Sequence, residues 1–203
     1  MFNIFNKKYK LTHQTKKVDG HTLYQIKALK SFGDVEKGDR GGWIEGYANL
    51  SQSGNAWIYG DAKVYDNAKV YGKAKVYHKA KVYHKAKVYG NAMVRGYALV
   101  GDCAKVYGKA KVHGEAIVCD NAKVYDGAIV CDSAKVGGNA WVYDNAQIFG
   151  NAFVSGVAEI YGNAEVYGRA GVFNQATVYG HAKVYGHAKV YGNTLVHGDT
   201  VVS

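Results

Sequence analysis

Residues 69–90 read KVYGKAKVYHKAKVYHKAKVYG, and this stretch decides the fold because its pattern recurs every six residues. Isoleucine or valine occupies every sixth position from Ile58 to Val202, 25 times without interruption. The residue four positions later is alanine from Ala62 to Ala188 and threonine in the last two units. A hexad repeat of this length predicts a solenoid, in which each unit buries its apolar side against its neighbours.

One unit, Ala68–Lys73, shows what each position does. Small, charged, apolar and aromatic residues alternate over its first four places, so Ala68 and Val70 face inward while Lys69 and Tyr71 face outward on a short strand. The last two places form a corner. Its first residue is glycine in 15 of 24 units and mostly aspartate in the others, as a turn with a relaxed backbone requires.

Composition narrows the class of protein. The chain has 203 residues, no proline and a formal charge of +10, with the positive charge concentrated in the first two thirds. Proline cannot donate to a strand ladder, so its absence suits continuous strand pairing. No stretch approaches the roughly 20 apolar residues of a membrane span, and the start, MFNIFNKKYK, lacks a signal-peptide core. With three cysteines suggesting free thiols, we expect a cytoplasmic protein without a membrane partner.

The hexad pattern resembles that of the hexapeptide-repeat left-handed β-helix superfamily. An aliphatic residue with alanine or threonine four places later marks that family, and the resemblance covers residues 44–203. It implies an all-β, left-handed parallel β-helix of about nine triangular coils, three hexads to a coil. Those enzymes usually have glycine directly after the aliphatic residue, whereas tyrosine stands there in this chain. The inward spacing is unchanged, so the expected fold is the same.

The chain before the repeats predicts a separate cap. Ile44 and Leu50 look like two earlier hexads, set off by a two-residue insertion around residues 51–53. Residues 1–43 do not repeat, and they alternate apolar and polar residues around Asp19-Gly20, a favourable hairpin turn. We therefore expect an N-terminal β-hairpin cap over residues 1–43 and a β-helix over 44–203.

The cap sequence carries a second resemblance. Its KYKLT, FGDV and GDRGGWIE segments are similar to the front of phage, prophage and enterobacterial hexapeptide-repeat proteins, often described as acyltransferases or polymer-forming proteins. The resemblance implies a phage- or prophage-associated protein that acts in the host cytoplasm. A description that rests on fold alone says little about activity.

Residues eighteen apart stack on neighbouring coils, which gives the rod three faces. On the third face, the residue after the aliphatic one is tyrosine seven times in succession. The residues that we predict as a ligand or partner surface on this face are Lys69, Lys87, Lys105, Lys123, Tyr71, Tyr89, Tyr107 and Tyr125. Lysine attracts phosphate and tyrosine offers stacking, so the pattern favours a nucleotide-like anion or another anionic partner. Structural cladding of the rod by stacked rings is the alternative.

The first and second faces lose this tyrosine and lysine pattern between residues 93 and 155. We predict these positions as interface or pocket residues: Met93, Arg95, Leu99, His113, Ile117, Cys119, Ile129, Cys131, Phe149 and Phe153. Outward apolar residues mixed with small ones suggest a contact surface, either with a host protein or with another copy. By resemblance that contact is the lateral interface of a trimer. Drift of the repeat is the alternative.

An enzyme of this superfamily would need a histidine base in a cleft between subunits. On the alternative hypothesis of a trimeric acyltransferase, His113 is the candidate for this general base. No loop interrupts residues 58–203 to help hold a substrate, which argues against catalysis. Histidines six apart fall on different corners and cannot share one ion, so we expect no metal site and no cofactor.

The function expected from these observations is binding. We predict a non-catalytic β-solenoid that binds an anionic ligand or a host protein, with the acyltransferase and a purely structural rod as alternatives. We also expect an end-to-end homodimer through the last coil, with Thr200 and Val202 as its contact.

Overall fold

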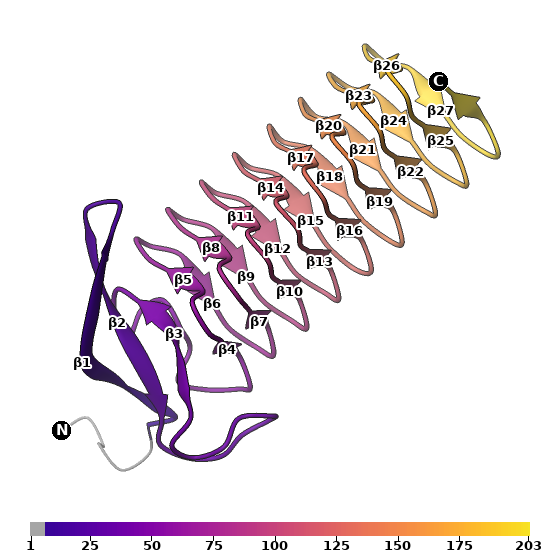
Figure 1. Cartoon of the computed structure of the whole chain (residues 1–203). Helices are drawn as coiled ribbons and strands as arrows, with labels where there is room; N and C mark the ends of the chain where they lie inside the picture. The colour runs from indigo at the N-terminus through magenta and orange to yellow at the C-terminus, as the bar shows by residue number, and fades with distance from the viewer. Residues whose placement is uncertain (1–6) are drawn as a thin grey trace.

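The computed structural model describes residues 7–203 as an elongated parallel β-solenoid with an antiparallel hairpin at its N-terminal end (Figure 1). Residues 1–6 lie outside the described residues. They belong to the predicted cap and to the N-terminal segment in which the sequence shows no signal-peptide core. Over the described range all regular secondary structure is strand, and it includes no helix able to span a membrane.

Three sheets run along the rod. The first face is the sheet of β4 (Trp57–Ile58), β7 (Lys75–Val76), β10 (Met93–Val94), β13 (Lys111–Val112), β16 (Ile129–Val130), β19 (Gln147–Ile148), β22 (Glu165–Val166), β25 (Lys183–Val184) and β28 (Val201–Val202). The second face is the sheet of β1 (Tyr9–Val18), β2 (His21–Ala28), β3 (Arg40–Ile44), β5 (Lys63–Val64), β8 (Lys81–Val82), β11 (Leu99–Val100), β14 (Ile117–Val118), β17 (Lys135–Val136), β20 (Phe153–Val154), β23 (Gly171–Val172) and β26 (Lys189–Val190). The third face is the sheet of β6 (Lys69–Val70), β9 (Lys87–Val88), β12 (Lys105–Val106), β15 (Lys123–Val124), β18 (Trp141–Val142), β21 (Glu159–Ile160), β24 (Thr177–Val178) and β27 (Leu195–Val196).

The predicted all-β solenoid of about nine coils with a hairpin cap is confirmed. Strands eighteen residues apart pair in parallel and in register, for example Lys105 with Lys123. At the start of the rod the offset is twenty residues, because Ile44 pairs with Val64 and Leu50 bridges to Val70. That difference is the predicted two-residue insertion. The left-handed sense of the coil and the boundary at residue 44 stay predictions.

The core is two kinds of residue stacked in columns. The alanines from Ala56 to Ala188 are buried along the rod, and so are the valines and isoleucines at every sixth position from Ile58 to Val196. Small alanines leave room for the branched residues across the narrow interior, and burial of each branched side chain contributes about 1.5–3 kcal/mol. The threonines of the final coil are exposed, and the Thr194 Oγ1 hydroxyl donates to the Tyr191 carbonyl at 2.7 Å.

The hairpin turns at Asp19-Gly20 as predicted, and its second strand joins the rod through β3. Lys8 and Tyr9 hold the hairpin's base to the first coil. The buried Lys8 Nζ donates to the Ala56 carbonyl at 2.8 Å, and the Tyr9 hydroxyl donates to the Leu50 carbonyl at 2.7 Å. The hairpin thereby supplies donors to backbone carbonyls at the N-terminal end of the core.

Candidate functional site

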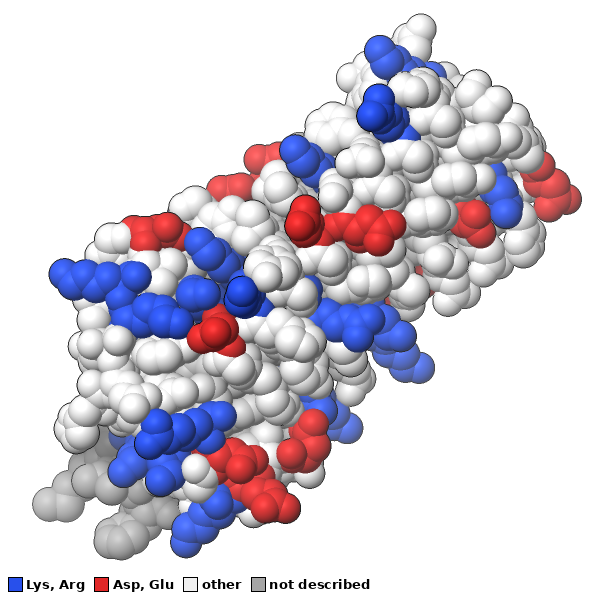
Figure 2. All heavy atoms as spheres, viewed as in Figure 1, with Lys and Arg blue, Asp and Glu red and all other residues white. Residues whose placement is uncertain are grey.

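The third face brings the predicted lysines and tyrosines together on one sheet. The lysines Lys69, Lys87, Lys105 and Lys123 are in-register neighbours on consecutive strands. Stacked strands lie about 4.8 Å apart, so this sheet presents one ammonium group per strand over four strands. Figure 2 shows that lysine and arginine side chains gather most densely over the N-terminal half of the rod.

These lysines differ from those of the other two faces near the cap. On the first and second faces, Lys75 pairs with Asp34 and Lys81 pairs with Asp19, both carboxylates of the cap segment. Within residues 7–203, the side chains of Lys69, Lys87 and Lys105 have no ion pair or hydrogen bond. Like charges on directly opposite strand positions are unfavourable. The third face therefore holds a column of positive charge without a counter-charge from the described chain.

The tyrosine ladder of this face is continuous. Successive rings from Tyr71 to Tyr179 stack with centroids 4.8 to 5.0 Å apart and interplanar angles of 1° to 10°. His197 extends the stack beyond Tyr179 at 5.3 Å. On the other two faces the stacks are short, such as Tyr65 with Tyr83 at 5.8 Å.

The ring geometry changes what the tyrosines can offer a ligand. Each ring from Tyr89 to Tyr161 has a neighbouring ring on both sides, so its faces are covered and only its edge and hydroxyl are left to contact a ligand. Base stacking, which the sequence suggested, needs a free ring face. Burial and the neighbouring Tyr125 raise the pKa of Tyr107 to about 12, so its hydroxyl stays protonated and can donate a hydrogen bond.

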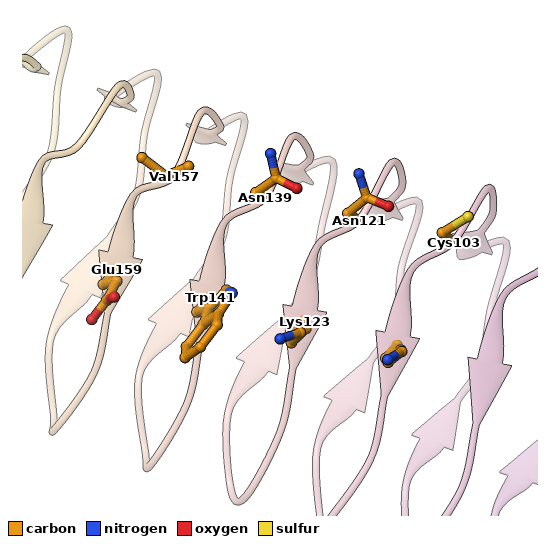
Figure 3. Close-up of a pocket in the computed structure, with 8 residues that line it drawn as sticks. Cys103, Asn121, Lys123, Asn139, Trp141, Val157 and Glu159 are labelled. Carbon is orange, nitrogen blue, oxygen red and sulfur yellow. The ribbon is translucent and has the colours of Figure 1, made fainter.

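A groove lies where the lysine column ends. It has a volume of about 520 Å³ and is formed by two parallel rows of side chains, shown in Figure 3. The corner row is Cys103, Asn121, Asn139 and Val157, and the strand row is Lys105, Lys123, Trp141 and Glu159. The Lys123 Nζ lies 4.1 Å from the centre of the Trp141 ring, and 38% of Trp141 is exposed.

Sequence reasoning identified Lys105 and Lys123 but missed Trp141, Glu159 and the asparagines. The signal was available, because counting eighteen residues onward from Lys123 reaches Trp141 and then Glu159. The prediction included only the lysine positions of this column, and it omitted the next positions because other residue types occupy them.

The residues predicted as interface or pocket lie on two faces. Met93, Arg95, His113, Ile129, Cys131 and Phe149 belong to strands of the first face or directly follow them, and Leu99, Ile117, Cys119 and Phe153 belong to the second in the same way. Arg95 and Phe153 are exposed and the others are half-buried. Their role as an interface stays a prediction.

The break in the second face's ladder has a local cause. A Cβ atom on Gly101 would lie 2.6 Å from the ring of Tyr83, so this ring occupies the space above Gly101. Any larger residue at 101 would have to displace the ring of Tyr83. The loss of tyrosine at this position is therefore tied to packing with the preceding coil.

The geometry around His113 provides a poor general base. Burial, and then the charge of Arg95, lower the pKa of His113, which favours the neutral imidazole that a base needs but makes it a weaker proton acceptor. Within residues 7–203 no hydrogen bond orients its ring, although a catalytic histidine is normally held by a partner. The acyltransferase alternative stays a prediction that an acetyl-transfer assay on His113→Ala would test.

The three cysteines are free thiols, and two of them, Cys119 and Cys131, are poorly suited to nucleophilic chemistry. Burial and then Asp120 raise the pKa of Cys119 to about 11, and burial and then Asp132 raise the pKa of Cys131. Both thiols are protonated at neutral pH, and the thiolate is the reactive form.

One group of potential metal ligands sits where the hairpin turn meets the rod. His21 Nδ1 lies 3.0 Å from Glu45 and its Nε2 lies 3.3 Å from Asp66. The hydrogen bond that His21 makes to the Glu45 carboxylate raises the pKa of His21, burial opposes this, and the charge of Asp66 adds to the increase. These three side chains satisfy one another as a bridge between hairpin and coil.

A second such group is Asp102, Cys119 and Asp120 at the corner between the second and third faces. Asp102 accepts the backbone N–H of Asp120 at 3.2 Å, and Asp120 accepts that of Gly138 at 2.7 Å. The carboxylates thus hold successive corners together, which accounts for their positions without a metal ion.

The residues predicted for an end-to-end contact lie in the last described coil. Thr200 is exposed and Val202 is half-buried, and the neighbouring Leu195 and Val201 are 62% and 58% exposed. The Thr200 hydroxyl donates to the His197 carbonyl at 2.7 Å. Both the end-to-end dimer and the lateral trimer stay predictions.

Comparison with known proteins supports the solenoid. Residues 86–102 match the family model of the YdcK β-solenoid repeat. The matched segment includes β9 and β11 and the third-face residues Lys87 and Tyr89. A comparison of the sequence with curated proteins finds no match. The similarity is to a repeat unit, so it supports the architecture and leaves the function to be argued from the surface.

Proposed function

We propose that this β-solenoid is a non-catalytic binding module whose third face holds an anionic ligand. The observation that carries the proposal is the in-register column of Lys69, Lys87 and Lys105, none of which has an ion pair within the described chain. Two lysines at equivalent strand positions near the cap on the other faces, Lys75 and Lys81, are paired with Asp34 and Asp19.

The geometry gives an anion two kinds of contact. Ammonium groups one strand apart repel each other, and an anion lying along the column would relieve that repulsion. Beside them run the hydroxyl groups of the tyrosine ladder, which are neutral donors at physiological pH; at Tyr107 burial raises the pKa further, to about 12. A ligand extended along the rod would meet the same pair of groups on each coil from Lys69 to Lys123.

The further expectations from the sequence join this proposal. They are a phage or prophage association, a cytoplasmic location, and a nucleotide-like anion or a host protein as partner. The similarity of the cap to phage and enterobacterial hexapeptide-repeat proteins supports the first two. The basic third face supports an anionic ligand over an uncharged one.

A charge-removal variant tests the proposal. Lys69, Lys87 and Lys105 are replaced together by glutamine, and binding of labelled oligothymidylate and labelled oligogalacturonate is measured by fluorescence anisotropy. Each exposed charge pair is worth about 0.2–1 kcal/mol, so the triple variant should weaken the tighter probe about tenfold. Binding by the unaltered protein should weaken as salt is raised.

The matched control removes three exposed lysines from the other two faces, Lys111, Lys135 and Lys189. This control variant has the same net charge as the test variant, and we expect its affinity to stay within about twofold of the unaltered protein. Equal losses in the two variants would mean that only net charge matters, and the proposed face would be wrong.

A further inference from the structure

The third face is not uniform along its length, and the point of change has its own chemistry. Lysine occupies the outward strand position up to Lys123, and Trp141 and Glu159 then take the next two strands. Figure 3 shows these side chains in a row along the strands, with Asn121 and Asn139 in a second row along the neighbouring corner of the groove. One end of this site is therefore cationic, and the other presents an aromatic ring, amides and a carboxylate.

The ring geometry distinguishes between classes of polyanion. A single-stranded nucleic acid gains affinity when its bases stack on open aromatic faces. The interior tyrosines present no open face, because their neighbours cover both sides at about 4.8 Å. Trp141 is the aromatic ring of the groove. The Lys123 Nζ lies over one of its faces at 4.1 Å, and 38% of the residue is exposed, so a ligand ring can pack on its remaining surface.

The other groove residues suit hydroxyl-rich rings. Asn121 and Asn139 offer amide donors and acceptors, and Glu159 offers an acceptor that the Tyr143 hydroxyl contacts at 3.5 Å. A pyranose ring has an apolar face for Trp141 and hydroxyl groups for the amides. In an extended sugar chain, one ring is about as long as the roughly 4.8 Å spacing of the strands.

We propose that the ligand of the third face is an acidic polysaccharide, with a sugar ring packed on Trp141 between Asn121 and Asn139 and its carboxylates facing Lys105 and Lys123. This inference rests on the proposed function, because it names the class of anion held by the lysine column. The lysines supply attraction to the charged chain, and the Trp141 groove recognises the sugar.

The experiment measures oligogalacturonate binding to the full chain carrying Trp141→Ala, with Phe153→Ala as the control. Phe153 is an exposed aromatic residue on the second face, 44% exposed against 38% for Trp141. We expect Trp141→Ala to weaken oligogalacturonate binding about tenfold, since the variant loses the aromatic surface on which a sugar ring packs. Phe153→Ala should leave the affinity within about twofold. Unfolding temperature is recorded for both, so that a folding defect is recognised.

Oligothymidylate of matched charge and fully methyl-esterified oligogalacturonate complete the test. The polysaccharide inference is supported if the acidic sugar binds more tightly than both and depends on Trp141. If oligothymidylate binds as tightly and neither probe responds to Trp141→Ala, the polysaccharide inference is wrong while the anion-binding face survives. If neither charged probe depends on Lys69, Lys87 and Lys105, the proposed function itself fails.

Discussion

At the scale of single residues, the corners show how the repeat tolerates residues other than glycine. Every first corner residue from Gly60 to Gly198 has a positive φ, including six aspartates, two histidines and one asparagine. A positive φ costs a residue with a side chain roughly 1–2 kcal/mol. Several aspartates offset that cost with a hydrogen bond to the next coil, as Asp132 does by accepting the backbone N–H of Gly150 at 3.0 Å.

Asp132→Ala tests this compensation. Alanine keeps the strain of the positive φ at 57° and loses the hydrogen bond, so we expect a loss of about 1–2 kcal/mol of stability. Asp132→Gly loses the same bond but removes the strain, and should be the more stable variant. The midpoints of urea-induced unfolding of the two variants are compared. Equal midpoints would show that the positive φ causes no strain for the aspartate hydrogen bond to offset.

At the scale of elements, the hairpin is fixed to the rod by a few polar side chains. Lys8 is 1% exposed, and its Nζ donates to the carbonyls of Ala56 and Gly54 at 2.8 and 3.3 Å. Burial and then Lys30 lower the pKa of Lys8 to about 8. At the opposite end of the hairpin, the turn contacts the coils through Asp19 and His21.

Lys8→Met should loosen the hairpin. Methionine fills a similar volume but leaves the Ala56 and Gly54 carbonyls without this donor, which costs about 1–3 kcal/mol. Amide hydrogen exchange should show loss of protection in β1 and β2. The control is Lys17→Met, since Lys17 is exposed. Similar amide exchange in the two variants would show that Lys8 does not hold the hairpin to the rod.

The contact at His21 predicts a pH dependence. The folded state raises the pKa of His21, so its stabilising effect is complete below the unfolded value near 6.5 and is lost as pH rises through the raised pKa. The facing carboxylates are Glu45, Asp66 and Asp19. Hydrogen bonds from Tyr65 and then Lys81 hold the pKa of Asp19 below its usual range.

Protection of the β1–β2 hairpin against exchange, corrected for intrinsic rates, should therefore fall between mildly acidic and mildly alkaline pH. The His21→Gln variant should lack most of this change. A pH profile that is the same in both proteins would show that His21 does not control the hairpin.

At the scale of the whole molecule, the repeat made most of the architecture predictable. A period of eighteen fixes which residues stack, so the lysine column and the tyrosine ladder from Tyr71 to Tyr179 followed from counting alone. The tilt of the rings did not, because it depends on how neighbouring side chains pack. The same holds for Lys8, whose partner carbonyls come from a docking contact that no repeat specifies.

The candidate site was half predictable for a related reason. Lys105 and Lys123 belong to a column of identical residues, whereas Trp141 and Glu159 break it. A sequence pattern shows where residues are alike, and the groove is formed where they differ. The central claim is that the uncompensated charge of this face serves to hold an anionic chain.

Lysine footprinting tests that claim most directly. The protein is acetylated under limiting reagent with and without a saturating anionic probe, and the reaction at each lysine is followed by mass spectrometry. We predict that oligogalacturonate protects Lys69, Lys87 and Lys105 by at least about threefold while Lys111 and Lys135 react as before. Unchanged reaction at the third-face lysines, or equal protection on all faces, would contradict the account.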